Sequence, residues 1–153
     1  MSLRLILPGP ADTDALGASL ARALPAGSMV AYLRGDLGAG KSSLARALLR
    51  ELGVMGAIRS PTYTLVERYP VPGGEAAHLD LYRLGDAAEL DFLGLDGLAA
   101  DATLWLVEWP ERGRAGLPKP DLRIALAIDG EGRRASLVAG SDTGTTWLAR
   151  TPF

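Results

Sequence analysis

The sequence predicts an α/β domain, in which helices flank a central sheet of buried strands. Two near-continuous apolar runs, 29–34 (MVAYLR) and 102–108 (ATLWLVE), are typical of strands that are covered on both faces. A glycine-rich stretch, GDLGAGKSS, follows the first run directly, and an amphipathic segment with leucines at four-residue spacing follows the glycines. The 153 residues suffice for one domain with a substantial core.

Each element follows from hydrophobic periodicity and from the residues that interrupt it. Helices are predicted at 12–24, at 42–52 and, more weakly, at 86–101. Strands are predicted at 3–7, 29–34, 62–69, 75–84, 102–108, 122–129 and 133–140. The last two strands form a C-terminal β-hairpin. We expect Asp12 or Thr13 near the N-cap of the first helix, and interruptions of the weak helix at Gly94 and Gly97.

Charge and composition exclude several classes of function. A formal net charge of −2 argues against a broad phosphate-binding face, so we expect no DNA partner and no direct, tight binding of RNA outside a local patch. The chain contains no cysteine, which excludes disulfides, cysteine nucleophiles and cysteine metal ligands. No apolar run is long enough to span a bilayer, and the N-terminal run is too short for a signal peptide, so a cytoplasmic protein without a membrane partner is expected.

The choice of polar residues is unusual. Fourteen arginines stand against two lysines, Lys41 and Lys119, and the chain contains neither Asn nor Gln. In a chain that nearly always uses arginine, a retained lysine indicates a need for lysine itself. The absence of Gln leaves Asp or Glu to position an attacking water in any hydrolysis. The absence of Asn excludes the usual N-K-x-D guanine motif, which favours ATP over GTP.

The glycine-rich stretch matches the phosphate-binding loop G-x-x-x-x-G-K-[ST], beginning at Gly35. Glycines let the backbone approach a ligand closely, and the turning chain points its N–H groups at an anion near the positive end of the next helix. The lysine supplies a compact charge for the outer phosphates, and the serine that follows it offers a hydroxyl to Mg²⁺. The predicted ATP-binding residues of the loop are Gly38, Ala39, Gly40, Lys41, Ser42 and Ser43.

A phosphate-binding loop acts with an acidic residue at the end of a buried strand, which holds the Mg²⁺ shell. Two residues qualify: Glu108 ends the more apolar run, and Asp80 lies in AHLDLYRL. Trp109 follows the first of them, where it either stacks on a base or packs under the loop. A lone histidine in a strand, His78, is more often structural than catalytic. The segment 60–65 (SPTYTL) is either a switch that senses the γ-phosphate or a polar strand entry.

Four blocks, GDLGAGKSS, SPTYTLVERY, HLDLYRL and VEWPER, occur in this order, and together they resemble the TsaE family of bacterial ATPases of tRNA threonylcarbamoyladenosine synthesis. The resemblance runs from about Thr13 to Arg133. It implies a single P-loop NTPase domain over 1–153, with a mixed central β-sheet flanked by helices. It also implies Mg²⁺-dependent ATP hydrolysis that serves a complex of TsaD and TsaB, which modifies the adenosine next to the anticodon.

The resemblance also implies roles by position. Lys41, Asp80 and Glu108 correspond to catalytic residues, and Ser42 and Glu108 to residues at the metal. Thr13, Trp109 and Arg133 correspond to further ATP-binding residues, although the family more often has Thr where Ser42 and Ser43 stand. Two other functions stay open. One is a small-molecule P-loop kinase, with 111–120 as an arginine-rich lid. The other is an assembly module that nucleotide gates.

Overall fold

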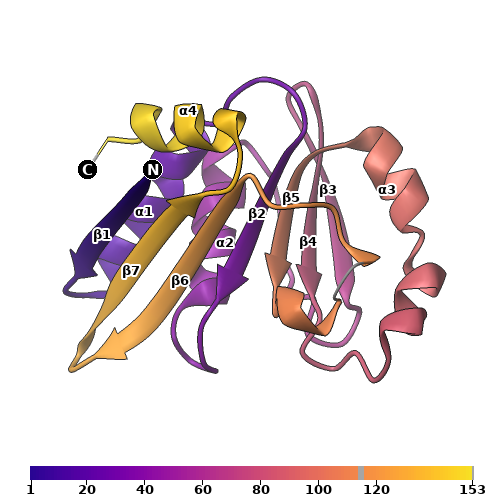
Figure 1. Ribbon diagram of the computed structural model, residues 1–153, viewed down its shortest axis with the longest axis horizontal. Coiled ribbons are helices and arrows are strands. Elements are labelled where there is room, and N and C mark those ends of the chain that lie inside the picture. The colour runs from indigo at the N-terminus through magenta and orange to yellow at the C-terminus, as the bar shows by residue number, and fades with distance from the viewer. Residues whose placement is uncertain (114–115, 153) are drawn as a thin grey trace.

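The structure, a computed structural model, describes residues 1–113 and 116–152, and it contains one seven-stranded sheet (Figure 1). The strands are β1 (Ser2–Leu7), β2 (Met29–Arg34), β3 (Val66–Val71), β4 (Gly74–Asp80), β5 (Ala102–Glu108), β6 (Leu122–Asp129) and β7 (Gly132–Ala139). The helices are α1 (Pro10–Arg22), α2 (Lys41–Glu51), α3 (Leu95–Asp101) and α4 (Asp142–Arg150), with 3₁₀ turns η1 (Ala87–Leu93) and η2 (Pro110–Arg112).

The two apolar runs of the sequence form neighbouring parallel strands, β2 and β5, in the middle of the sheet. The strand order is β1-β7-β6-β2-β5-β4-β3. Strands β6, β2, β5 and β4 are parallel, whereas β1, β7 and β3 pair in the antiparallel sense toward the edges. The expected mixed sheet, with helices on its flanks and β6 and β7 as a C-terminal hairpin, is therefore confirmed.

One side of the sheet is covered by α1, α2 and α4. In Figure 1, α1 and α2 lie behind β1, β7 and β6, and α4 lies above the upper ends of these strands. Leu20, Leu44 and Leu48 from the helices pack against inward side chains of the strands. Helix α1 approaches α2 very closely at Gly17, where an added Cβ would lie 2.7 Å from the carbonyl oxygen of Leu44. This close approach fixes the position of the helix that begins in the glycine-rich loop.

The other side of the sheet is covered only in part. Leu90 of η1 and Leu98 of α3 pack against Trp105 and Val107 of β5 and against neighbouring residues of β4. In the described chain, no helix covers the same side of β1, β7 and β6 (Figure 1). Within the described residues, no helix is both long and apolar enough to cross a membrane.

Two predicted strands are shorter than the sequence suggested. The strand expected at 62–69 begins only at Val66, because Leu65 has a left-handed backbone (φ 67°) and its N–H bonds the carbonyl of Pro61 to close a turn. The strand expected at 75–84 ends at Asp80, whose carboxylate accepts a hydrogen bond from the N–H of Tyr82 at 3.0 Å. In both places a local turn replaces the strand ladder.

The helices differ from expectation at their ends. Helix α1 has Gly9 as its N-cap. Asp12 is the third residue of the helix, and its carboxylate accepts a hydrogen bond from the N–H of Gly9 at 2.9 Å. Asp12 therefore lies near the N-cap, as expected, while the cap itself is Gly9, because Pro10 is pre-set for the first helical position. Gly94 (φ 70°) separates η1 from α3 as expected, but Gly97 lies inside α3 and does not interrupt it.

Helix α4 was not predicted. Its N-cap is Ser141, whose hydroxyl accepts a hydrogen bond from the N–H of Gly144 at 3.0 Å. Trp147 is fully buried and donates its indole N–H to the carbonyl of Leu20 at 2.9 Å. The helix thereby fastens the C-terminal part of the chain to α1.

Candidate nucleotide-binding site

The glycine-rich loop connects β2 to α2 and forms the floor of the candidate site. Gly40 is the N-cap of α2 and has φ 106°, a conformation that favours glycine, so the chain turns sharply just before Lys41. The loop lines a hollow of about 250 Å³ together with residues of β4, β5 and the turns that follow them. An anion in this hollow would face the N-terminal amides of α2.

Lys41 lies inside the hollow and is only 5% exposed. Its Nζ bonds the backbone carbonyl of Gly35 and lies 3.3 Å from that of Asp36. Burial lowers the pKa of Lys41 from its ordinary value, and the carboxylates of Glu108 and Asp80 oppose that shift. The site therefore holds a partly desolvated cation, which is the group that an outer phosphate requires.

Glu108 and Asp80 end neighbouring parallel strands and are paired in the strand register. They are 2% and 5% exposed, so neither points to solvent. The hydroxyl oxygen of Ser42 lies 3.1 and 3.2 Å from the two carboxylate oxygens of Glu108. Asp80 accepts hydrogen bonds from the N–H of Tyr82 and, at 3.4 Å, from the hydroxyl of Thr62.

The donor set fits Mg²⁺, because a hydroxyl and carboxylates are the hard oxygen ligands that this ion takes. Ser42 and Glu108 are the two residues that would hold it, with phosphate oxygens as further ligands. The described residues contain no cluster of three or more His, Cys, Asp or Glu side chains suited to a metal ion.

His78 belongs to the site, although sequence reasoning favoured a structural role. Its Nε2 lies 2.6 Å from an oxygen of Glu108, and its Nδ1 is buried without a hydrogen-bond partner in the described structure. The Nε2 nitrogen therefore carries the proton that it donates to the carboxylate. The sequence contained one indication of this role. His78 and Asp80 are two residues apart, and this spacing places both side chains on one face of a strand.

The ring of Trp109 lines the hollow beside the loop. The Nζ of Lys41 lies 4.0 Å from its ring centroid, and the ring of Tyr82 packs against it at 5.0 Å. Trp109 also has a left-handed backbone (φ 56°), which is uncommon for a residue other than glycine and turns the chain out of β5. Of the two alternatives left open by the sequence, the structure shows the ring against the lysine.

Thr13 and Arg133 lie on the opposite side of the loop from the carboxylates. Both line a second hollow of about 260 Å³, which shares Gly38, Gly40 and Ser43 with the first. Arg133 reaches from the β6–β7 hairpin to the loop, where its guanidinium donates to the carbonyls of Ala39 and Gly38, each at 3.1 Å. The hairpin thus braces the phosphate-binding loop across 94 residues of sequence.

The switch segment proposed at 60–65 also reaches the site. The hydroxyls of Ser60 and Thr62 lie 2.7 Å apart, and the second bonds Asp80. The segment is a turn rather than the start of a strand, and Thr62 is its residue in contact with Asp80. The possible lid at 111–120 contains residues 114–115, which lie outside the described residues.

Fold and site together define a P-loop protein: a parallel sheet core, a glycine loop opening a helix, and acidic residues at the ends of adjacent strands. The family model "Threonylcarbamoyl adenosine biosynthesis protein TsaE" matches residues 7–136. The chain belongs to the TsaE family.

Individual relatives agree. The TsaE protein of Haemophilus influenzae is 40% identical over 117 residues, which cover 76% of this chain and 74% of the relative. The TsaE protein of Treponema pallidum is 32% identical and covers 90% of this chain and 100% of its own length. The crystal structure of YdiB from Bacillus subtilis superposes with a TM-score of 0.77 at 24% identity, covering 99% of this chain and 94% of that one, and it shows the same fold.

Proposed function

We propose that residues 1–153 form a single ATPase domain that hydrolyses ATP with Mg²⁺ and serves threonylcarbamoylation of tRNA by acting on a TsaD–TsaB complex. The observation that carries the proposal is the contact between Ser42 of the loop and Glu108 at the end of β5, beside the buried Lys41. A phosphate-binding loop used only as a turn would have no reason to bury these charges together.

The loop binds the triphosphate through its backbone N–H groups, from Gly38 to Ser43. Lys41 supplies positive charge to the outer phosphates, where burial makes that charge act more strongly than it would in water. Thr13 and Arg133 extend the binding surface on the other side of the loop. The hydrogen bonds from Arg133 hold two carbonyls of the loop away from the bound phosphates, so that the amides of the loop face the anion.

Hydrolysis needs a water aligned with the γ-phosphorus, and the chain has no Gln to align it. Asp80 and Glu108 are the buried carboxylates that line the hollow, and we assign the water to them. Bound Mg²⁺ would neutralise charge on the phosphates. Thr62 bonds Asp80 and so connects the 60–65 segment to the state of the nucleotide.

The names of the relatives support a role in threonylcarbamoyladenosine biosynthesis. The choice of TsaD and TsaB as partners is what the resemblance to the TsaE family implies. In this proposal TsaD and TsaB install the group and contact the tRNA, while hydrolysis by this chain resets them between turnovers. The chain itself meets tRNA only through its partners.

The test is to incubate the protein with γ-labelled ATP and Mg²⁺, alone and with TsaD and TsaB. We expect slow release of free phosphate that the partners accelerate. A labelled small molecule would instead identify a kinase. A Glu108→Ala variant that binds the partners but stops both phosphate release and tRNA modification would support the ATPase, whereas modification that survives this change would indicate an assembly module.

A further inference from the structure

The side of the sheet opposite α1 and α2 carries a second feature, away from the nucleotide site. On this side, no helix covers β1, β7 and β6 in the described chain. The strand register aligns the side chains that these three strands and β2 point away from α1 and α2, so that they form rows across the sheet. The middle row consists of Arg4, Ser136, Ala125 and Arg34. Arginines therefore stand at both ends of a row whose centre holds only small residues.

The rows on either side add Arg123 of β6 and Arg134 of β7. We call the four residues Arg4, Arg34, Arg123 and Arg134 the arginine face. All four are exposed. Of these four arginines, only Arg134 forms an ion pair with a described residue, Asp129 at 3.6 Å. A chain with a net charge of −2 thus concentrates unneutralised positive charge on one surface.

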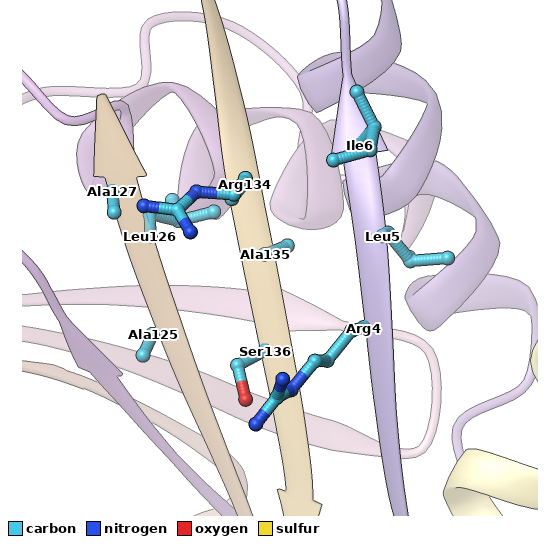
Figure 2. A pocket seen from close by; sticks show the side chains of 9 residues that line it. All are labelled: Arg4, Leu5, Ile6, Ala125, Leu126, Ala127, Arg134, Ala135 and Ser136. Carbon is cyan, nitrogen blue, oxygen red and sulfur yellow. The ribbon is translucent and has the colours of Figure 1, made fainter. Parts of the chain in front are cut away.

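The arginine face is hollowed. Ser136, Ala125 and Ala127 form part of the lining of a trough of about 580 Å³ (Figure 2). In this view the side chain of Arg4 extends toward Ser136, and that of Arg134 extends from β7 toward β6. The rim also includes an apolar residue, Ile6, which is 66% exposed.

The dimensions of the trough suit a helix. The trough lies over β1, β7 and β6, which span two strand spacings, or about 10 Å. An α-helix with its side chains is about 10–12 Å across. The neighbouring half of the same side already accepts helical segments, η1 and α3, which bury Leu90 and Leu98. Those segments are acidic, with Glu89, Asp91 and Asp96 among their residues.

We propose that the arginine face docks an acidic amphipathic helix of the TsaD–TsaB complex; this inference rests on the function proposed above. The apolar stripe of that helix lies on the small residues of the trough, and its carboxylates pair with the arginines at the rim. Arginine forks match carboxylates in bidentate geometry, and arginine is enriched in protein interfaces.

The surface favours a protein helix over RNA. Single-stranded RNA is recognised by stacking its bases on aromatic side chains. The aromatic residue nearest the rows, Tyr32, is half-buried and donates its hydroxyl to the carbonyl of Pro118 at 2.5 Å. The exposed apolar side chains of Ile6 and Val138 suit a protein partner better than a phosphate backbone.

The experiment measures the affinity of the full chain for the purified TsaD–TsaB pair of the same organism, in the presence of ATP. Arg4→Glu and Arg123→Glu should each weaken binding about tenfold or more, because a reversed charge repels the carboxylates. Ala125→Trp fills the trough without changing the charge and should weaken binding similarly. Arg150→Glu, an exposed reversal on α4, is the matched control and should leave binding unchanged.

Each outcome decides a separate point. ATP affinity and thermal unfolding equal to the parent's show that the variants are folded, with an intact nucleotide site. If the parent binds TsaD–TsaB and all three face variants bind equally well, the docking inference is wrong and the proposed function stands. If the parent does not bind the pair at all, the partner assignment fails, and the docking inference fails with it. Loss of affinity for tRNA alone would make the surface an RNA interface and overturn the inference.

Discussion

The candidate nucleotide site and the arginine face use charge in opposite ways. In the site, Lys41, Asp80 and Glu108 are at least 95% buried, and each has a hydrogen-bond partner. On the arginine face, the charges are exposed and, apart from Arg134, form no ion pair in the described structure. Buried charge is fixed in place by the fold and acts on a small ligand, whereas exposed charge contributes little to folding and stays available to a partner.

Lys41→Ala gives the largest expected effect and tests whether the buried charge of the site binds ATP. Removing the ammonium deletes charge-assisted hydrogen bonds worth about 3 kcal/mol, so ATP affinity should fall about 100-fold. Isothermal titration calorimetry measures the change. Lys119→Ala, at the only other lysine, is the control and should bind ATP normally. Equal affinity in the Lys41 variant would remove the basis of the site.

His78→Leu tests whether the buried charges depend on their partners. The change removes the donor to Glu108 and leaves a buried carboxylate oxygen less satisfied, so the free energy of unfolding should fall by about 1–3 kcal/mol. Urea unfolding followed by circular dichroism provides the measurement. His78→Gln restores a side-chain N–H and should recover part of the loss. Unchanged stability in the leucine variant would show that the 2.6 Å contact contributes nothing.

Trp109→Leu tests the contact between the lysine and the aromatic ring. Cation–π interactions contribute about 0.5–2 kcal/mol, so ATP affinity should fall by roughly 2- to 30-fold. Tyr82→Phe keeps the neighbouring ring and should bind ATP as the parent does. If both variants bind equally, the 4.0 Å contact with Lys41 is only packing.

The pH dependence of ATP binding tests how far burial affects the site. Because burial lowers the pKa of Lys41, its charge is lost at a lower pH than that of an exposed lysine, whose pKa is 10.5. ATP affinity should therefore decline as the pH rises toward that value, since deprotonation removes the positive charge. Titrations between neutral and alkaline pH measure the decline. Lys41→Arg keeps its charge throughout and should show no such decline.

Arg4→Ala gives the smallest expected effect and tests whether the exposed charge of the arginine face contributes to stability. An exposed arginine without an ion pair contributes little to folding, so the free energy of unfolding should change by less than about 0.5 kcal/mol. The same unfolding assay used for His78→Leu makes the contrast direct. A loss as large as that of the histidine variant would show that the arginine face stabilises the fold, and the proposed difference between the regions would disappear.

Sequence reasoning located the parts of the site that are contiguous or that end a buried strand. The loop from Gly35 to Ser43 carries its own signal, because its glycines and lysine are neighbours in sequence. The apolar run before Glu108 predicted a buried strand that ends in a carboxylate. The role of His78 was missed, because its partner lies 30 residues away and only strand register brings the two together.

Hydrophobic periodicity did not predict other parts of the fold. The turn at Leu65 shortened a predicted strand, since its left-handed backbone is set by a bond to Pro61 rather than by propensity. Helix α4 was missed, although Trp147 and its bond to Leu20 fasten it to the core. The arginine face was not predicted, because its four residues come from four strands.

The sequence by itself determined an α/β domain with a phosphate-binding loop and the two strands that carry the carboxylates of the site. It also determined that no glutamine is present. These follow from neighbouring residues, whose chemistry and periodicity act over a few positions. Only the tertiary structure decided that Arg133 braces the loop, that His78 bonds Glu108, and that four arginines share an open surface. Such features arise when strands distant in sequence are paired in register, and that pairing is a property of the whole fold.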